Sequence, residues 1–397
     1  LIDEYDCQMT ANINNETLYK QFQEKIKSFY ATIKNKWPIK FLGITGVTRL
    51  KDVEIFSIGS DIRDITNASA YSQMIGFTRD EIKKFYIDYL KLAASYENNC
   101  SVDDVTDTQL ESLLDRLAKN YDGYCFDEFY KKKVFSTWSV NSFFQSILEN
   151  KFVFFDEYWY DNGGLPSILV NYLKTHELNI FEYLDKDKFL KVSSDDFKNP
   201  TALTTINQNV LMCQTGYLTL RSDLNKTSTV ALGIPNGEIY KALNRLLANN
   251  IFKGNTDITD DYGRSLLEVG TVDDIINLFN SALNSVSYDN YPIVSESSVQ
   301  NMLKLYLLGA HQKVLSEVHE AKGRADLVVN TDNRRIVFEF KYAKNETEAK
   351  SKLLDAVEQI KTRDYGNILP KKAELLRIAA VFNADPKVRA FTEYQQV

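Results

Sequence analysis

The sequence predicts a multidomain α/β protein with a partial parallel α/β unit, a mainly helical middle domain and a C-terminal α/β domain. Its length of 397 residues favours two or three domains. Apolar runs of strand length lie near both ends of the chain, whereas apolar and aromatic residues in the middle follow helical spacing. Hydrophobic residues make up 44% and charged residues 25%, as in ordinary globular domains. We expect domains at residues 1–75, 76–260 and 261–397.

The first domain has the order strand, helix, strand. Residues 1–6 (Leu-Ile-Asp-Glu-Tyr-Asp) and 41–47 (Phe-Leu-Gly-Ile-Thr-Gly-Val) predict strands, and apolar residues at three- and four-residue steps predict a helix at 16–36. This order is typical of a parallel sheet. Asp3 and Glu4 end the first strand, where many nucleotide-hydrolysing proteins place a Mg²⁺-holding Asp and a water-polarising Glu.

The middle domain is predicted to be helical with one hairpin. Thr78 as N-cap and Glu81 at the capping-box position begin a helix. Residues 217–220 and 228–232 alternate around a polar turn at 223–225, which predicts two antiparallel strands.

The C-terminal domain has the order helix, hairpin, helix, strand. Amphipathic spacing and alternating apolar runs predict its elements. They are helices at 272–283, 295–308 and 346–362, paired strands at 323–329 and 337–341 with a turn at 331–333, a late strand at 376–382, and a short polar tail.

The paired strands carry the most informative polar residues of the chain. Alternation along a strand puts Glu339 and Lys341 on one face and Phe338 and Phe340 on the other. With Asp326 near the start of the neighbouring strand, two carboxylates and an ammonium can converge on one side of a sheet whose other side is apolar. Such a group is suited to binding a hard divalent cation and holding a water beside it.

A simpler interpretation of the same residues is structural. Asp326 would cap a turn, and Glu339 and Lys341 would form a solvent-exposed pair on the sheet. Asp, Glu and Lys are depleted in strands, however, and here they interrupt otherwise apolar runs. This pattern favours a functional site.

The composition of the chain argues against a zinc site and a membrane span. The four cysteines are scattered without a Cys-x-x-Cys pair and there are only three histidines, so a zinc site is not expected. No apolar run approaches the ~18 residues of a membrane span, and the first residues do not form a signal peptide. We expect a reduced, cytoplasmic setting without membrane association.

Charge is unevenly distributed along the chain. The net charge of −7 argues against indiscriminate coating of nucleic acid. From Lys322 to the end there are 15 Lys and Arg against 11 Asp and Glu, so the C-terminal part is the basic end of an acidic protein. This distribution fits a nucleic-acid-binding module, although a surplus of this size is common on any surface.

Several short motifs span nearly the whole chain in a recognisable order. They are residues 1–6, 44–47, 64–66, 76–78, 121–124, 159, 166–167, 214–219, 234–236, 323–326, 339–341 and 359–360. In this order the sequence resembles bacterial proteins that join an AAA-like ATPase domain to a C-terminal PD-(D/E)XK nuclease superfamily domain. The first motif resembles their Walker B strand and the second their sensor strand, with Thr45 as the sensor residue.

The resemblance implies roles for the residues of the paired strands. Asp326, Glu339 and the Phe340 carbonyl would bind Mg²⁺ or Mn²⁺, which the sequence does not distinguish because both accept oxygen ligands. Lys341 would orient the attacking water or stabilise charge on the phosphorane. The C-terminal domain would then have the restriction-endonuclease-like fold.

Three further residues are implied in the same way. Gln359, on the helix after the hairpin, would contact water or backbone phosphate. Glu296, near the start of its helix, would be an additional metal ligand, and Glu317 competes with it for that role.

One departure from the resemblance concerns the phosphate-binding loop. No Gly-x-x-x-x-Gly-Lys-Ser/Thr occurs in the chain, so we do not expect it to hydrolyse ATP by itself. Either the phosphate-binding half lies upstream of Leu1, or the ATPase part with Asp3, Glu4 and Thr45 is a relic that serves as scaffold. ATP is expected as a cofactor only in the first case.

Three functions remain open from sequence. The first is metal-dependent phosphodiester hydrolysis of DNA or RNA by the C-terminal domain. The second is a nucleotide-dependent switch or scaffold whose nuclease-like domain only binds nucleic acid or a protein partner. The third is a catalytically dead scaffold, which requires Asp326 and Glu339 to lie too far apart to share an ion.

Overall fold

The structure is a computed structural model. It describes residues 1–36, 39–49, 62–161, 167–173, 176, 178–200, 205–252, 262–310, 312–320, 323–367 and 374–397. The chain divides into two compact units, one of Leu1–Leu178 with Asp185–Ala242 and one of Asn179–Leu184 with Leu243–Val397. None of the described helices is both long and apolar enough to cross a membrane.

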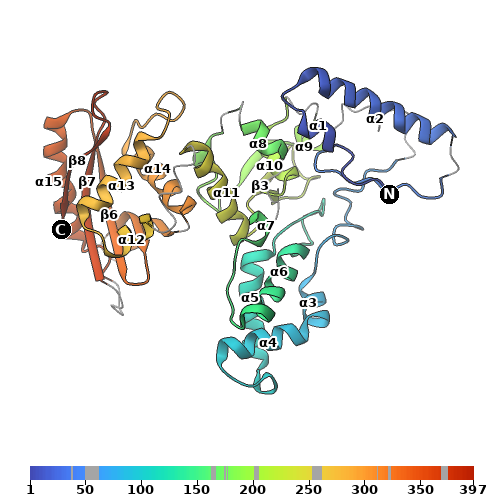
Figure 1. Ribbon diagram of the computed structural model, residues 1–397, viewed down its shortest axis with the longest axis horizontal. Coiled ribbons are helices and arrows are strands. Elements are labelled where there is room, and N and C mark those ends of the chain that lie inside the picture. Colours follow the sequence, from blue (N-terminus) through green and yellow to red (C-terminus); the bar gives the residue numbers. More distant parts are fainter. Residues whose placement is uncertain are drawn as a thin grey trace. The chain divides into compact units, whose positions relative to one another are not determined.

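The N-terminal segment contains two helices and a short parallel contact (Figure 1). Its helices are α1 (Cys7–Ala11) and α2 (Glu16–Lys36). Ile2 and Ile44 form an isolated parallel bridge, with hydrogen bonds from the Thr45 N–H to the Ile2 carbonyl (2.9 Å) and from the Tyr5 N–H to the Thr45 carbonyl (3.0 Å). The predicted parallel pairing is therefore present, but the full strands predicted here are not formed. In the part that the structure describes, no neighbouring strand extends this ladder.

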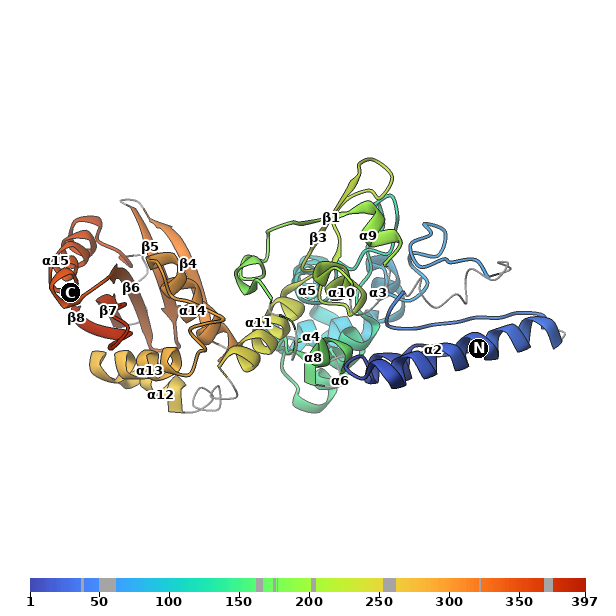
Figure 2. The same ribbon diagram turned by 90° about the horizontal axis from the view of Figure 1, so that it is seen from above.

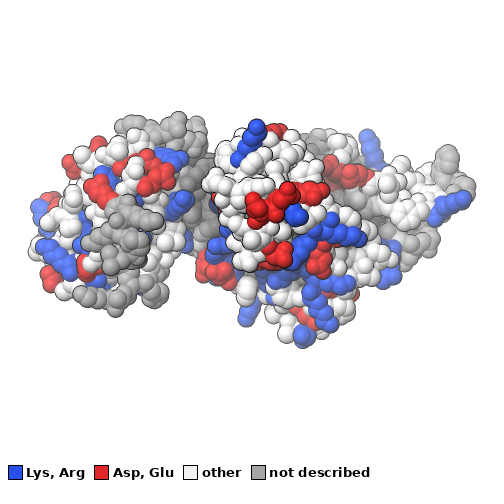
Figure 3. Space-filling model, turned by 90° about the horizontal axis from the view of Figure 1, so that it is seen from below, with Lys and Arg blue, Asp and Glu red and all other residues white. Residues whose placement is uncertain are grey.

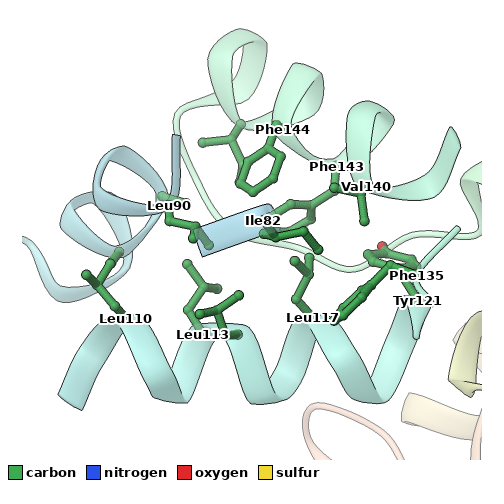
Figure 4. Close-up of a cluster of buried hydrophobic side chains, with 14 residues drawn as sticks. Ile82, Leu90, Leu110, Leu113, Leu117, Tyr121, Phe135, Val140, Phe143 and Phe144 are labelled. Carbon is green, nitrogen blue, oxygen red and sulfur yellow. The ribbon is translucent and has the colours of Figure 1, made fainter. Parts of the chain in front are cut away.

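The first unit is otherwise mainly helical, as predicted. The Thr78–Glu81 capping box begins α3, because the Thr78 side chain accepts from the Glu81 N–H while the Glu81 carboxylate accepts from the Thr78 N–H. A buried apolar cluster joins α3 to α6, with Leu113 and Leu117 facing Phe143 (Figure 4). The elements are α3 (Arg79–Phe85), α4 (Ile87–Asn98), η1 (Val102–Asp104), α5 (Asp107–Tyr121), α6 (Thr137–Asn150), α7 (Tyr158–Asp161) and α8 (Ser167–Leu173).

A three-stranded antiparallel sheet completes this part of the chain. The predicted hairpin is confirmed as β2 (Thr219–Leu220) paired with β3 (Thr229–Gly233). β1 (Leu190–Ser193), which the sequence did not reveal, pairs with the other edge of β3. The other helices in this stretch of the chain are η2 (Ile180–Glu182), which belongs to the second unit, and α9 (Ser194–Lys198), α10 (Gln208–Gln214) and α11 (Gly237–Ile251).

The second unit is built on a five-stranded mixed sheet of order β4-β5-β6-β7-β8. β5 and β6 form the predicted hairpin, and β6 and β7 are parallel because α15 connects them as a crossover. The elements are α12 (Tyr262–Val269), α13 (Val272–Asn284), α14 (Glu296–Gly309), β4 (Lys313–Glu320), β5 (Gly323–Asn330), β6 (Arg334–Ala343), α15 (Glu346–Arg363), β7 (Glu374–Asn383) and β8 (Ala390–Gln396).

Two strands of this sheet differ from the expectation. The predicted polar tail is wrong, because its last residues form β8, which pairs antiparallel with β7. β4 was not predicted either. Both are edge strands, and edge strands bury less surface and therefore show a weaker alternation of apolar and polar residues.

Helices cover both faces of the sheet (Figure 2). α15 packs Ala356 and Ile360 against Val337 of β6 on one face. On the other face Phe279 of α13 contacts Phe338 of β6, with ring centroids 5.3 Å apart. The fold class predicted from sequence is thus confirmed as mixed α/β with a helical middle. The predicted domain boundaries stay a prediction, and the one at 260/261 falls outside the described residues.

Candidate active site

The candidate site lies where β5 and β6 separate. The two strands pair from Asn330 opposite Arg335 to Leu327 opposite Phe338, and the register ends there. Beyond this point the Asp326 side chain replaces the backbone pairing of the two strands. Its Oδ2 accepts a hydrogen bond from the Phe340 N–H at 2.8 Å. The carboxylate is thereby fixed beside β6 at the opening between the strands.

Glu339 lies on β6, directly after the last residue that pairs with β5. Its side chain is fully buried, and Lys341 Nζ donates to its Oε1 at 2.7 Å. Its Oε2 is also buried and has no hydrogen-bond partner in the described part of the chain. Leaving a buried carboxylate oxygen unpaired is costly, and a bound ion would satisfy it. The solvent-exposed pair considered from sequence is therefore wrong for Glu339.

Lys341 lies between two carboxylates. Besides Glu339, its ammonium is 3.5 Å from Oε1 of Glu296, which is the first residue of α14. The side chain of Lys341 is only 16% exposed, whereas that of Glu296 is 43% exposed. Glu296 is thus placed next to the lysine at the edge of the site.

These contacts shift the pKa values of Glu339 and Lys341. Burial, followed by the charges of Asp326 and Glu296, raises the pKa of Glu339 to about 7, although the hydrogen bond from Lys341 opposes the shift. Burial alone would lower the pKa of Lys341, but the hydrogen bond and charge of Glu339, with Glu296 and Asp326, raise it instead. Lys341 therefore remains a cationic donor at neutral pH, while Glu339 is poised near its titration point.

Gln359 lies on α15 and faces a tyrosine rather than the carboxylates. Its Nε2 donates to the hydroxyl of Tyr365 at 3.3 Å, and Arg363 Nη1 donates to the same hydroxyl at 2.8 Å. The pKa of Arg363 is raised first by Tyr365 and further by the charges of Glu339 and Asp326. Arg363 and Tyr365 were missed from sequence. A basic residue in a last helical turn, such as Arg363, is usually explained by the helix dipole.

Gln300 is a further residue that sequence reasoning missed. It is buried on α14, and its Nε2 donates to the backbone carbonyl of Asp326. The signal was a polar residue within the broad apolar face of that helix. Gln300 holds the backbone from which the Asp326 side chain projects.

The oxygen atoms at this opening fit a hard divalent cation. Carboxylates of Asp326 and Glu339, one with an unpaired buried oxygen, are the donors that Mg²⁺ and Mn²⁺ prefer. Among the described residues, however, no three His, Cys, Asp or Glu side chains lie together as a ready metal cluster. Glu296 faces Lys341, so the fit to a divalent cation rests on the carboxylates of Asp326 and Glu339.

Some predicted residues lie outside this description. Glu317 is on β4, but its side chain is not among those described. Pro166, in the motif at 166–167, is outside the described residues.

The predicted ATPase residues lie together near the N-terminus. Thr45 Oγ1 donates to Oδ1 of Asp3, and the Glu4 N–H donates to Thr45 Oγ1 at 3.3 Å. Asp6 is fully buried and accepts from the Thr48 N–H at 2.6 Å. This hydrogen bond connects the end of residues 1–6 to the loop that follows residues 41–47. The strand-end acid and the sensor residue are thus in direct contact.

Comparison with known proteins matches both ends of the chain. Residues 1–56 match a family described as "Predicted AAA-ATPase", and residues 294–391 match the PD-(D/E)XK nuclease superfamily. A protein of Azotobacter chroococcum mcd 1, described as an uncharacterized protein in the vnfD 5' region, is 22% identical over 398 residues. The match covers 98% of this chain and 69% of that protein. No solved structure gives a significant match.

Proposed function

We propose that this chain, which joins an AAA-ATPase-like segment to a C-terminal PD-(D/E)XK nuclease superfamily domain, is a divalent-metal-dependent nuclease. The observation that carries the proposal is the opening between β5 and β6. There the buried Glu339 has an unpaired oxygen, Asp326 is fixed by the Phe340 N–H, and Lys341 is held as a cation.

Each residue has a distinct role in this proposal. Asp326 and Glu339 would hold Mg²⁺ or Mn²⁺ together with the Phe340 carbonyl, and the bound ion would supply Lewis acidity and an activated water. Lys341, kept protonated by its acidic neighbours, would donate to a phosphate oxygen and stabilise the charge that develops there. Glu296 remains a proposed additional ligand, although its contact in the structure is with Lys341.

The charge of the chain argues against general binding of nucleic acid. On the face shown in Figure 3, Lys and Arg are interspersed with Asp and Glu. The net charge is −7, so electrostatic attraction to a polyanion has to come from local groups. DNA or RNA is the proposed substrate, with the phosphate contacts concentrated near the site.

Cleavage of labelled oligonucleotides tests the function. Single- and double-stranded DNA and RNA are incubated with Mg²⁺, Mn²⁺ or EDTA, with Asp326→Ala and Lys341→Ala beside the parent. We expect metal-dependent cleavage by the parent and a loss of about 100-fold or more in both variants, as when a group that stabilises transition-state charge is removed.

Lys344→Ala is the matched control, because Lys344 is an exposed lysine three residues further along the chain. It should cleave like the parent. Cleavage that persists in EDTA or in Asp326→Ala would contradict the proposal, provided that circular dichroism shows the variants folded.

A second candidate function is a nucleotide-dependent switch or scaffold. The contact of Thr45 with Asp3 favours it, because the two residues that the resemblance assigns to ATP chemistry remain paired. Absence of cleavage on every substrate, together with stable binding of nucleic acid, would favour this function over the nuclease.

A further inference from the structure

The last turn of α15 carries a cation beside the candidate site. Arg363 ends this helix, and its side chain is exposed. The Tyr365 hydrogen bond raises its pKa most, and the charges of Glu339 and Asp326 raise it further, so the guanidinium lies within electrostatic range of both carboxylates. An exposed arginine next to an acidic pair is a candidate for binding an anionic ligand.

The position of Arg363 is determined by two contacts. Its Nη1 donates to the Tyr365 hydroxyl at 2.8 Å, and Tyr365 is fully buried and also accepts from Gln359. Its aliphatic stem crosses Gly323, where an added Cβ would lie 2.5 Å from Arg363 Cδ. Gly323 begins β5, three residues before Asp326, so the arginine extends from α15 to the strand that carries the first carboxylate.

A helix-dipole role does not account for this arrangement. A basic side chain in a last turn needs only to lie near the terminal carbonyls, as exposed Lys361 on the same turn can do. Arg363 instead spans two elements, and its recorded hydrogen-bond partner among the described residues is a neutral hydroxyl. Since a guanidinium has five N–H donors, most of its capacity is available for a ligand.

We propose that Arg363 binds the phosphate next to the cleaved bond and so positions the nucleic-acid strand over Asp326 and Glu339. The inference rests on the proposed function and adds a substrate contact to it. A planar guanidinium matches phosphate in a bidentate manner, which an ammonium cannot reproduce. The buried tyrosine limits the motion of the side chain, which reduces the entropy lost on binding.

The test measures binding separately from cleavage. Labelled oligonucleotide is titrated with the full chain in Ca²⁺, which occupies oxygen sites and allows binding to be measured apart from turnover in Mg²⁺. Arg363→Ala should weaken binding about tenfold and reduce the slope of log affinity against log salt by about one, as expected for one lost phosphate contact. Arg363→Lys should restore the salt slope but only part of the affinity.

Lys361→Ala is the matched control, because it removes the same charge from the same exposed turn. It should change affinity less than twofold. Equal affinity and salt slope for Arg363→Ala and the parent would overturn the proposal, and so would an equal loss in Lys361→Ala. Thermal unfolding of each variant shows whether the fold is retained.

The outcomes separate this inference from the nuclease itself. If the parent binds but does not cleave in Mg²⁺ or Mn²⁺, a selective loss of binding in Arg363→Ala still supports the phosphate contact while the nuclease proposal fails. If the parent cleaves and Arg363→Ala has an unchanged KM, only the phosphate contact is overturned. A parent that neither binds nor cleaves overturns both.

Discussion

Asp326 has a structural contact as well as a proposed catalytic role. Its side chain replaces the backbone acceptor that β6 loses when β5 diverges, so the Phe340 N–H remains paired at 2.8 Å. An N–H left unpaired in a buried strand is unfavourable. The geometry of the site and the integrity of the sheet therefore depend on the same carboxylate.

The two roles of Asp326 can be separated by substitution. Asp326→Ala leaves the Phe340 N–H without its acceptor and should lower the free energy of unfolding by about 1–3 kcal/mol. Asp326→Asn keeps an acceptor oxygen and should lose clearly less stability, while both variants lose cleavage. Urea unfolding measures the first effect, and equal destabilisation by both substitutions would refute the structural role.

Among the elements, the start of α11 has an unusual set of contacts. Glu238 is buried in its first turn, where it accepts from Ser139 Oγ of α6 at 2.7 Å and from the Trp159 N–H of α7 at 2.8 Å. One carboxyl group thus connects three helices. Burial, with a contribution from Glu157, raises its pKa from 4.5 to about 7.

This shift predicts a dependence of stability on pH. Because the pKa of Glu238 is higher in the folded state, the folded protein binds more protons than the unfolded chain between about pH 4.5 and 7. Its contribution to stability is complete below this range and is lost as the pH rises through it. Glu238→Gln keeps the shape of the neutral carboxyl group. Its oxygen can accept from the Trp159 N–H, and its amide can donate to Ser139 Oγ once that hydroxyl turns. It should therefore remove a slope of at most about 1.4 kcal/mol per pH unit.

Chemical unfolding of the parent and of Glu238→Gln at several pH values between 5 and 8 measures this slope. The difference between the two proteins should change in favour of the variant as the pH rises. A difference that is constant across the range would show that Glu238 does not titrate as expected.

At the scale of the whole molecule, the two compact units have separate cores. The first contains the cluster around Leu113 and Phe143, and the second contains the faces of the five-stranded sheet. Units with separate cores commonly unfold in separate transitions.

Calorimetry of the full chain should therefore show two transitions. Leu327→Ala, at a fully buried position of β5, should lower the second unit's stability by about 2–5 kcal/mol and move only its transition. Leu113→Ala, fully buried on α5, is the matched substitution for the first unit. A single transition shifted by both substitutions would contradict independent unfolding.

Much of the local structure was predictable from the sequence. The capping box at Thr78, the β2–β3 and β5–β6 hairpins, and the face shared by Glu339 and Lys341 all follow from spacing and periodicity. These features depend on residues close together in the chain. The parallel contact between residues 1–6 and 41–47 also followed, because the order strand, helix, strand implies parallel neighbours.

What the sequence by itself determined was the fold class and the order of the predicted helices and hairpins, because residue types and periodicity are local properties. The tertiary structure decided that Glu339 is buried with an unpaired oxygen, that Arg363 crosses Gly323, and that the last residues form β8. Each of these depends on segments that are distant in sequence and meet only when the sheet assembles. Burial and electrostatic environment are set by such contacts, so the sequence favoured a functional site at Glu339 but left a solvated surface residue open.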